Sequence, residues 1–129
     1  MTNELSVQEF YDVIDETMER LPQEFQAFLS DEANFAIEVE EYPDWQTMQL
    51  AGVTHPNQLL GFYHGIPRTE RTSGYNMVLP DKISLYRQPL MRHYRTRASL
   101  TEGIRHTLLH EIAHHFGISD ERLRELGAY

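Results

Sequence analysis

The sequence predicts an α+β fold, one compact domain in which a small mixed sheet of about three strands packs against helices. Three observations predict it. Apolar residues recur at helical spacing near the N-terminus, apolar and polar residues alternate in short segments, and a long helical pattern lies near residues 100–116. No repeat, low-complexity run or Gly/Ser/Pro-rich linker divides the 129 residues, so we assign residues 1–129 to a single domain.

Helix signals fall at five places along the chain. Ser6-Val7-Gln8-Glu9 is a capping box that opens an amphipathic helix. Pro22 suits the first position of a short second helix, and Asp44 is expected to cap a third. Ser99-Leu100-Thr101-Glu102 is a second capping box, which we expect to open the long helix near residues 100–116. Gly117 should end that helix, and Ser119 or Asp120 should cap a last one.

Three segments show the features of strands. Residues 35–39 alternate between apolar and polar side chains, with an acidic outer face, and residues 59–64 form a second apolar run. Residues 83–87 alternate again, and Pro89 is expected to end this third strand by removing a backbone donor. We therefore place the third strand at an edge of the sheet. The segment from Gly65 to Gly74 is typical of a loop.

The composition excludes several classes of protein. There is no cysteine, so a disulfide framework, a cysteine-ligated zinc and a thiol nucleophile are excluded, and any metal must be held by His, Asp or Glu. The N-terminus lacks a basic start followed by an apolar run, and no stretch approaches the roughly 18 apolar residues of a membrane span. We expect a cytoplasmic protein without membrane contact.

The net charge of −9 is unevenly distributed, and it disfavours nonspecific binding to nucleic acid. Residues 1–50 hold thirteen acidic residues against one basic residue, whereas residues 51–129 hold seven acidic against ten basic residues. The basic cluster could receive an acidic substrate or a peptide carboxylate, but we favour a surface that complements the acidic half. Its members are Arg87, Arg92, His93, Arg95, Arg97 and Arg105.

The most informative segment is His110-Glu111-Ile112-Ala113-His114. Successive helical residues turn by about 100°, so His110 and His114 lie one above the other and both imidazoles can reach one ion. Glu111 lies on the same side, where a carboxylate can contact a metal-bound water without displacing it. Gly103 and Thr107 lie upstream on this polar stripe, and the glycine leaves room that suits a substrate groove. The opposite arc is apolar and should anchor the helix in the core; it comprises Ile104, Leu108, Leu109, Ile112 and Phe116.

A catalytic zinc keeps three protein ligands and one open position, so two histidines are not enough. Asp120 is the candidate third ligand, because a left-handed turn at Gly117 would reverse the chain and bring it back toward the ion. Asp120 could instead simply cap the last helix. His115 points about 100° away from His114 and is interpreted as a packed histidine or one that supports a ligand. His106 lies one turn before His110 and could approach the rim of the cleft, although we favour an exposed surface histidine. No spacing signal is carried by His55, His64 and His93.

The motif His110-Glu111-x-x-His114-x-x-Gly117-x-x-Asp120 resembles that of the small zincin-like minimal metallopeptidases of prokaryotes. Leu21-Pro22, the segment from Leu60 to Gly65 and the segment from Leu79 to Ile83 are also similar to this family, so the resemblance spans nearly the whole chain. It implies a zincin-like α+β fold, one zinc ion on His110, His114 and Asp120, and Glu111 as the catalytic acid and base.

The first functional hypothesis is a zinc-dependent metallopeptidase acting on a peptide or protein substrate. A zinc-activated water would attack the scissile carbonyl, and Glu111 would take its proton and later donate it to the leaving amine. Tyr86, Arg87 and His93 are candidate oxyanion partners, since the third strand could be the edge on which a peptide adds.

Two other functions remain open. A metal-dependent ribonuclease could use a related spacing of histidines, although Glu111 and the acidic charge argue against it. Alternatively, the domain could be a non-catalytic zinc-binding or partner-binding module, in which four protein ligands would close the site.

Overall fold

Five α-helices, a short 3₁₀ helix and three strands make up the part of the chain that the computed structural model describes, residues 4–21, 23, 26, 35–65 and 81–125. The elements are α1 (Val7–Glu19), β1 (Phe35–Glu40), α3 (Trp45–Ala51), η1 (Pro56–Gln58), β2 (Gly61–His64), β3 (Asp81–Tyr86), α4 (Arg87–His93), α5 (Arg97–Phe116) and α6 (Asp120–Glu125). Within these elements the side chains of six residues are outside the description: Phe35, Asp81, His115, Phe116, Asp120 and Leu123. The predicted helix at Pro22 and the predicted loop beyond Gly65 fall largely outside the described residues.

The sheet is mixed and has the strand order β1-β3-β2. β1 runs parallel to β3, with Ile37 opposite Ile83, and β2 runs antiparallel to β3, with Tyr63 opposite Ile83. The predicted α+β class with a small mixed sheet is confirmed. The predicted edge position of the third strand is wrong, because β3 pairs on both sides and β2 has no further strand neighbour among the described residues. Pro89 does follow the strand, as predicted, but it belongs to the helix after β3 and therefore carries no information on whether β3 is an edge strand.

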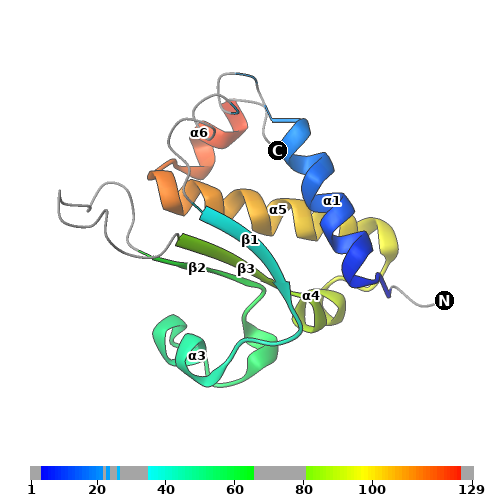
Figure 1. The fold of residues 1–129 in the computed structure, drawn as a ribbon, viewed down its shortest axis with the longest axis vertical. Helices are drawn as coiled ribbons and strands as arrows, with labels where there is room; N and C mark the ends of the chain where they lie inside the picture. Colours follow the sequence, from blue (N-terminus) through cyan, green and yellow to red (C-terminus); the bar gives the residue numbers. More distant parts are fainter. Residues whose placement is uncertain (1–3, 22, 24–25, 27–34, 66–80, 126–129) are drawn as a thin grey trace.

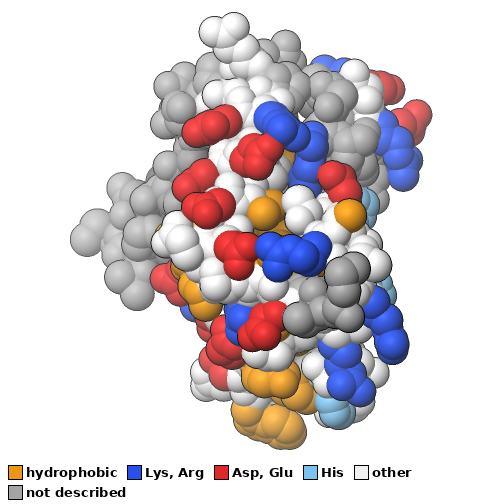
Figure 2. All heavy atoms as spheres, turned by 90° about the vertical axis from the view of Figure 1, so that its right-hand side faces the viewer, with side chains coloured by type: hydrophobic (Ala, Val, Ile, Leu, Met, Phe, Trp, Pro, Cys, Tyr) orange, Lys and Arg blue, Asp and Glu red, His pale blue; other side chains and the backbone are white. Residues whose placement is uncertain are grey.

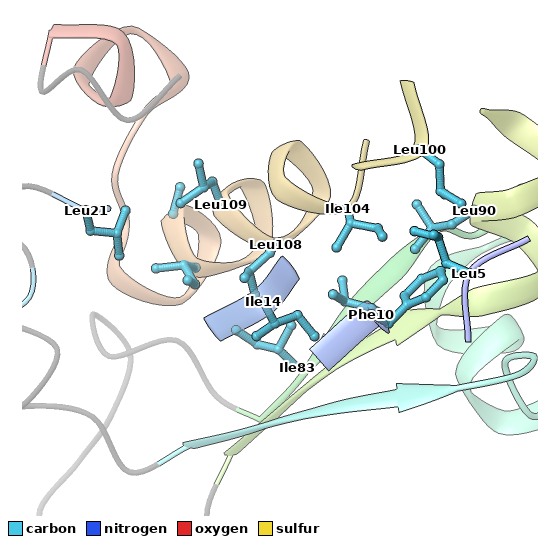
Figure 3. Packing of buried hydrophobic residues seen from close by; sticks show 13 residues of the cluster. Leu5, Phe10, Ile14, Leu21, Ile83, Leu90, Leu100, Ile104, Leu108 and Leu109 are labelled. Carbon is cyan, nitrogen blue, oxygen red and sulfur yellow. The ribbon is translucent and has the colours of Figure 1, made fainter. Parts of the chain in front are cut away.

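Helices α5 and α1 cover one face of the sheet, and α3 lies on the opposite side (Figure 1). The predicted apolar arc of α5 is fully buried at the four positions whose side chains are described, Ile104, Leu108, Leu109 and Ile112. These side chains meet Phe10 and Ile14 of α1 and Ile83 of β3 in one core (Figure 3). Burial of this arc fixes the rotation of α5, so the histidine stripe must face away from the core.

The helix starts follow capping chemistry. The predicted box at Ser6 is present, and Asp44 accepts a hydrogen bond from the Thr47 backbone at 2.7 Å at the start of α3. The predicted box at Ser99 is misplaced by one turn. The N-cap of α5 is Thr96, whose hydroxyl accepts from the Ser99 backbone, so the helix begins at Arg97 rather than near residue 100. A Ser or Thr on either side of a helix start gives the same local signal.

Pro89 lies in the first turn of α4, a helix that the strand pattern did not predict. A proline is tolerated there because the first backbone donors of a helix have no intrahelical acceptor. The strand therefore ends one residue earlier than predicted, at Tyr86, and a helix follows at once.

Ion pairs join the acidic N-terminal half to the basic C-terminal half. Arg97 contacts Glu9 at 2.8 Å, and Arg87 contacts Glu41 at 2.9 Å and Glu4 at 3.4 Å. Figure 2 shows acidic and basic side chains interspersed on the face that is on the right in Figure 1. At Arg87 and Arg97 the basic cluster thus complements the acidic half, as favoured from the sequence. No helix in the described part of the chain is long and apolar enough to cross a membrane.

Candidate metal centre

His110 and His114 lie one turn apart on α5, as the helical spacing predicts. Their ring centroids are 4.8 Å apart, and the ring planes are inclined by 43°. His110 is half-buried and His114 is exposed, so the pair stands where the helix leaves the core. Two neighbouring imidazoles on one helix face are a donor pair that suits zinc.

Glu111 lies beside this pair and reaches the sheet. Its carboxylate accepts a hydrogen bond from the backbone N–H of Tyr63 on β2. Burial raises the pKa of the Glu111 carboxyl, while the two imidazoles and the Tyr63 N–H partly oppose that rise. Loss of hydration disfavours the charged form, and this is the dominant effect here. A carboxylate with a raised pKa is a stronger base than an exposed one.

The N–H group that Glu111 binds belongs to the outer side of β2. Tyr86 donates to the Leu60 carbonyl at 2.9 Å, so residues 60, 62 and 64 exchange hydrogen bonds with β3. The backbone groups of Gly61 and Tyr63 consequently point away from β3, toward the side of β2 where no strand pairs among the described residues. Glu111 therefore lies at the side of β2 that faces away from β3.

Gly117 makes the turn that the sequence predicts. Its φ of 68° is left-handed, and the Ile118 N–H donates to the Ala113 carbonyl at 2.8 Å. Ser119 then accepts from the Arg122 backbone at 3.1 Å, so Ser119 caps α6 and Asp120 is its first residue. The Asp120 side chain is outside the description, and its role as a ligand stays a prediction. Among the side chains that are described, no group of three His, Asp or Glu converges as a metal site would require.

The comparison with known families covers this whole region. A family model described as zincin-like metallopeptidase matches residues 32–128. The chain belongs to the zincin-like metallopeptidase family. The predicted resemblance is thereby confirmed, and zinc is the metal that this family implies. No curated protein matches the chain.

The zincin-like fold does not bring the predicted oxyanion partners to Glu111. Tyr86 is buried on the face of the sheet opposite α5, beside Ser84 and Thr47, and burial raises its pKa to about 12. Arg87 is held by the Leu5 carbonyl at 2.7 Å. Leu5 precedes α1 at the end of the molecule where α5 begins, which is roughly 20 Å along the helix from the motif.

His93 is likewise distant from the motif. It ends α4 and contacts the ring of Tyr94, with centroids 4.6 Å apart, just before the start of α5. Once β3 is central rather than at an edge, these three residues lose the position that made them candidates.

The upstream stripe of α5 is packed rather than open. A Cβ at Gly103 would overlap the ring of Tyr94, and Thr107 is buried against Gly61 of β2. A hollow of about 280 Å³ does lie beside Gly103, but no motif residue lines it. The prediction that Gly103 leaves room above the ion is therefore wrong: the ring of Tyr94 fills that space.

The sequence analysis did not assign a role to two groups near the motif, the Tyr63 N–H and Gly61. The Tyr63 N–H is a backbone group, and its role depends on strand register. Gly61 did carry a signal, because an isolated glycine inside a strand often marks a close backbone approach.

The other face of the sheet carries a separate polar chain. His64 Nε2 lies 3.1 Å from Ser84 Oγ, which donates to Glu40 Oε2 at 2.5 Å. This chain links all three strands and is separated from Glu111 by the sheet itself.

Proposed function

We propose that this zincin-like metallopeptidase hydrolyses peptide bonds in a zinc-dependent reaction, with Glu111 as the general base and acid. One observation carries the proposal: the Glu111 carboxylate interacts with both imidazoles of the His110–His114 pair and accepts a hydrogen bond from the outward N–H of Tyr63 on β2. A peptidase needs a base beside the metal and a place to align an extended peptide, and this arrangement offers both.

The proposed zinc ligands are His110, His114 and Asp120. When bound, zinc supplies Lewis-acid activation of water and of the scissile carbonyl. Glu111 accepts the proton of the attacking water and returns it to the leaving amine. Burial raises the pKa of the Glu111 carboxyl, which strengthens it as a base.

The proposed substrate is a peptide or protein that lies along the outer side of β2. The backbone groups of Gly61 and Tyr63 face that side at the alternating spacing that an extended chain would match. The substrate edge is therefore assigned to β2 instead of the third strand, β3, which is central in the sheet.

The test compares metal-loaded protein on casein and on generic RNA, each with and without a chelator. We expect cleavage of casein alone, abolished by the chelator. The Glu111→Gln variant should retain zinc while its peptidase rate falls by roughly 10²–10⁴-fold, the usual contribution of a general base.

Glu102→Gln is the matched control, because Glu102 is an exposed carboxylate on the same helix and should leave the rate unchanged. Cleavage of RNA without casein would replace the peptidase by a ribonuclease. Unchanged turnover in Glu111→Gln would overturn the assignment of the base.

A further inference from the structure

Gly61 is the point at which the edge strand comes closest to the motif helix. A Cβ at this position would lie 2.8 Å from Thr107 Cγ2, 3.1 Å from the Ser84 carbonyl oxygen and 3.3 Å from Leu85 Cδ2. Carbon atoms in ordinary contact are about 3.5–4.0 Å apart. Gly61 is not among the described glycines with a left-handed backbone, so its conformation does not require glycine. The requirement is for space between β2 and α5.

The same strand and helix make a second contact further along. Thr107 precedes Glu111 by four residues, about 6 Å along a helix, and Gly61 precedes Tyr63 by two residues, about 6.6 Å along a strand. The contact of Gly61 with Thr107 and the hydrogen bond from Tyr63 to Glu111 are thus matched in spacing. The Gly61–Thr107 contact therefore sets the distance between β2 and α5 that the Tyr63–Glu111 hydrogen bond must span.

We infer that Gly61 is a positioning residue: by lacking a side chain it lets β2 lie against Thr107 and so places the Tyr63 N–H on the Glu111 carboxylate. This inference rests on the proposed function, in which Glu111 is the base and β2 is the substrate edge. A Cβ would separate strand and helix by about 1 Å to restore an ordinary carbon contact. A hydrogen bond of typical length would then be stretched beyond its useful range.

We expect a Cβ at Gly61 to lower the catalytic rate without displacing the metal ligands. Displacing reacting groups by about 1 Å can cost on the order of 10²-fold in rate. Because Gly61 is on the strand, we expect zinc affinity to be unaffected and the loss to fall on turnover and on substrate alignment.

The decisive measurement is amide hydrogen exchange in the metal-free protein, followed by NMR. In Gly61→Ala, exchange at the Tyr63 amide should accelerate at least tenfold, while the Phe62 amide, which bonds to β3, serves as the internal reference. Thr107→Ser removes the methyl group that a Cβ would meet, so the double variant Gly61→Ala/Thr107→Ser should restore protection of Tyr63.

Gly103→Ala is the matched control, because it also introduces a clash on α5, but against Tyr94 rather than β2. It should leave the Tyr63 amide protected. With zinc bound, Gly61→Ala should lower kcat by about 10–100-fold, with unchanged zinc affinity in a chelator competition, and the double variant should recover most of the rate.

Unaltered protection of Tyr63 in Gly61→Ala, absence of recovery in the double variant, or an equal effect of Gly103→Ala would each overturn the inference. If Gly61→Ala fails to fold, the double variant decides: a folded protein with Tyr63 protected supports the inference, and any other result contradicts it. The exchange data do not depend on turnover. A wild-type protein that cleaves nothing would therefore refute the proposed peptidase while leaving the positioning of Tyr63 by Gly61 separately measured.

Discussion

At the scale of single residues, burial of Glu111 disfavours its charged form. Its carboxylate is partly buried, and burial favours the neutral acid, although two imidazoles and one backbone N–H are nearby. The sequence predicted the helix face of Glu111 from spacing alone. It could not predict the partner on β2, because no local pattern encodes which backbone group of a distant strand comes within reach.

His64 should make the stability of the protein depend on pH. Burial, and then Lys82, lower the pKa of His64 below its ordinary value of 6.5, against the opposing effect of acidic neighbours. The unfolded chain therefore takes up this proton first as the pH falls below about 6.5, and stability declines until the pH passes the lower folded pKa. The groups around the ring are Phe62, Ser84, Glu38, Glu40, Asp44 and Lys82.

Urea unfolding at pH 7.5 and pH 5 measures this effect. His64→Gln should lose less stability between the two values than the wild type does. His93→Gln, at an exposed position on α4, should follow the wild type. An undiminished loss in His64→Gln would show that other groups govern the acid sensitivity.

At the scale of elements, the end of α5 determines where the third proposed ligand can lie. Gly117 has a φ of 68°, and replacing it by alanine should destabilise the protein by roughly 1–2 kcal/mol because a Cβ is strained there. If Asp120 is the third ligand as proposed, this turn positions it, so Gly117→Ala should also weaken zinc binding.

Gly52 offers a matched control for this prediction. It has a φ of 74° at the end of α3, and no atom lies within 4 Å of where its Cβ would be. Gly52→Ala should cost similar stability in urea unfolding and leave zinc affinity unchanged. Equal zinc affinity in Gly117→Ala and Gly52→Ala would show that the turn at Gly117 does not contribute to zinc binding.

The elements also show what local sequence can and cannot specify. The caps at Ser6 and Asp44 and the turn at Gly117 were predicted correctly because each depends on one side chain and its own backbone. The start of α5 was misplaced because Thr96 and Ser99 are both competent caps, three residues apart. The choice depends on how far the apolar face of the helix can be buried, which is a tertiary property.

At the scale of the whole molecule, the order of strands decides the function of each one. Alternation identified three strands but gave no information on which one would be central. β3 is the central strand, so Tyr86, Arg87 and His93 are not at a substrate edge and are no longer candidates for the oxyanion partner. β2 lies next to α5 instead, and through it Gly61 contacts Thr107 and Tyr63 binds Glu111. Strand order depends on contacts between segments far apart in sequence, which a local pattern does not record.

Zinc binding tests the central claim most directly. Isothermal titration of the metal-free protein should show one zinc per chain. Affinity should be lost by more than about 100-fold in His110→Ala and in His114→Ala, and retained in Glu111→Gln and in the control His106→Ala, one turn upstream on α5. Absence of zinc binding in the wild type, or a zinc affinity in His110→Ala and His114→Ala equal to that of the wild type, would contradict the metal centre from which the proposed peptidase is derived.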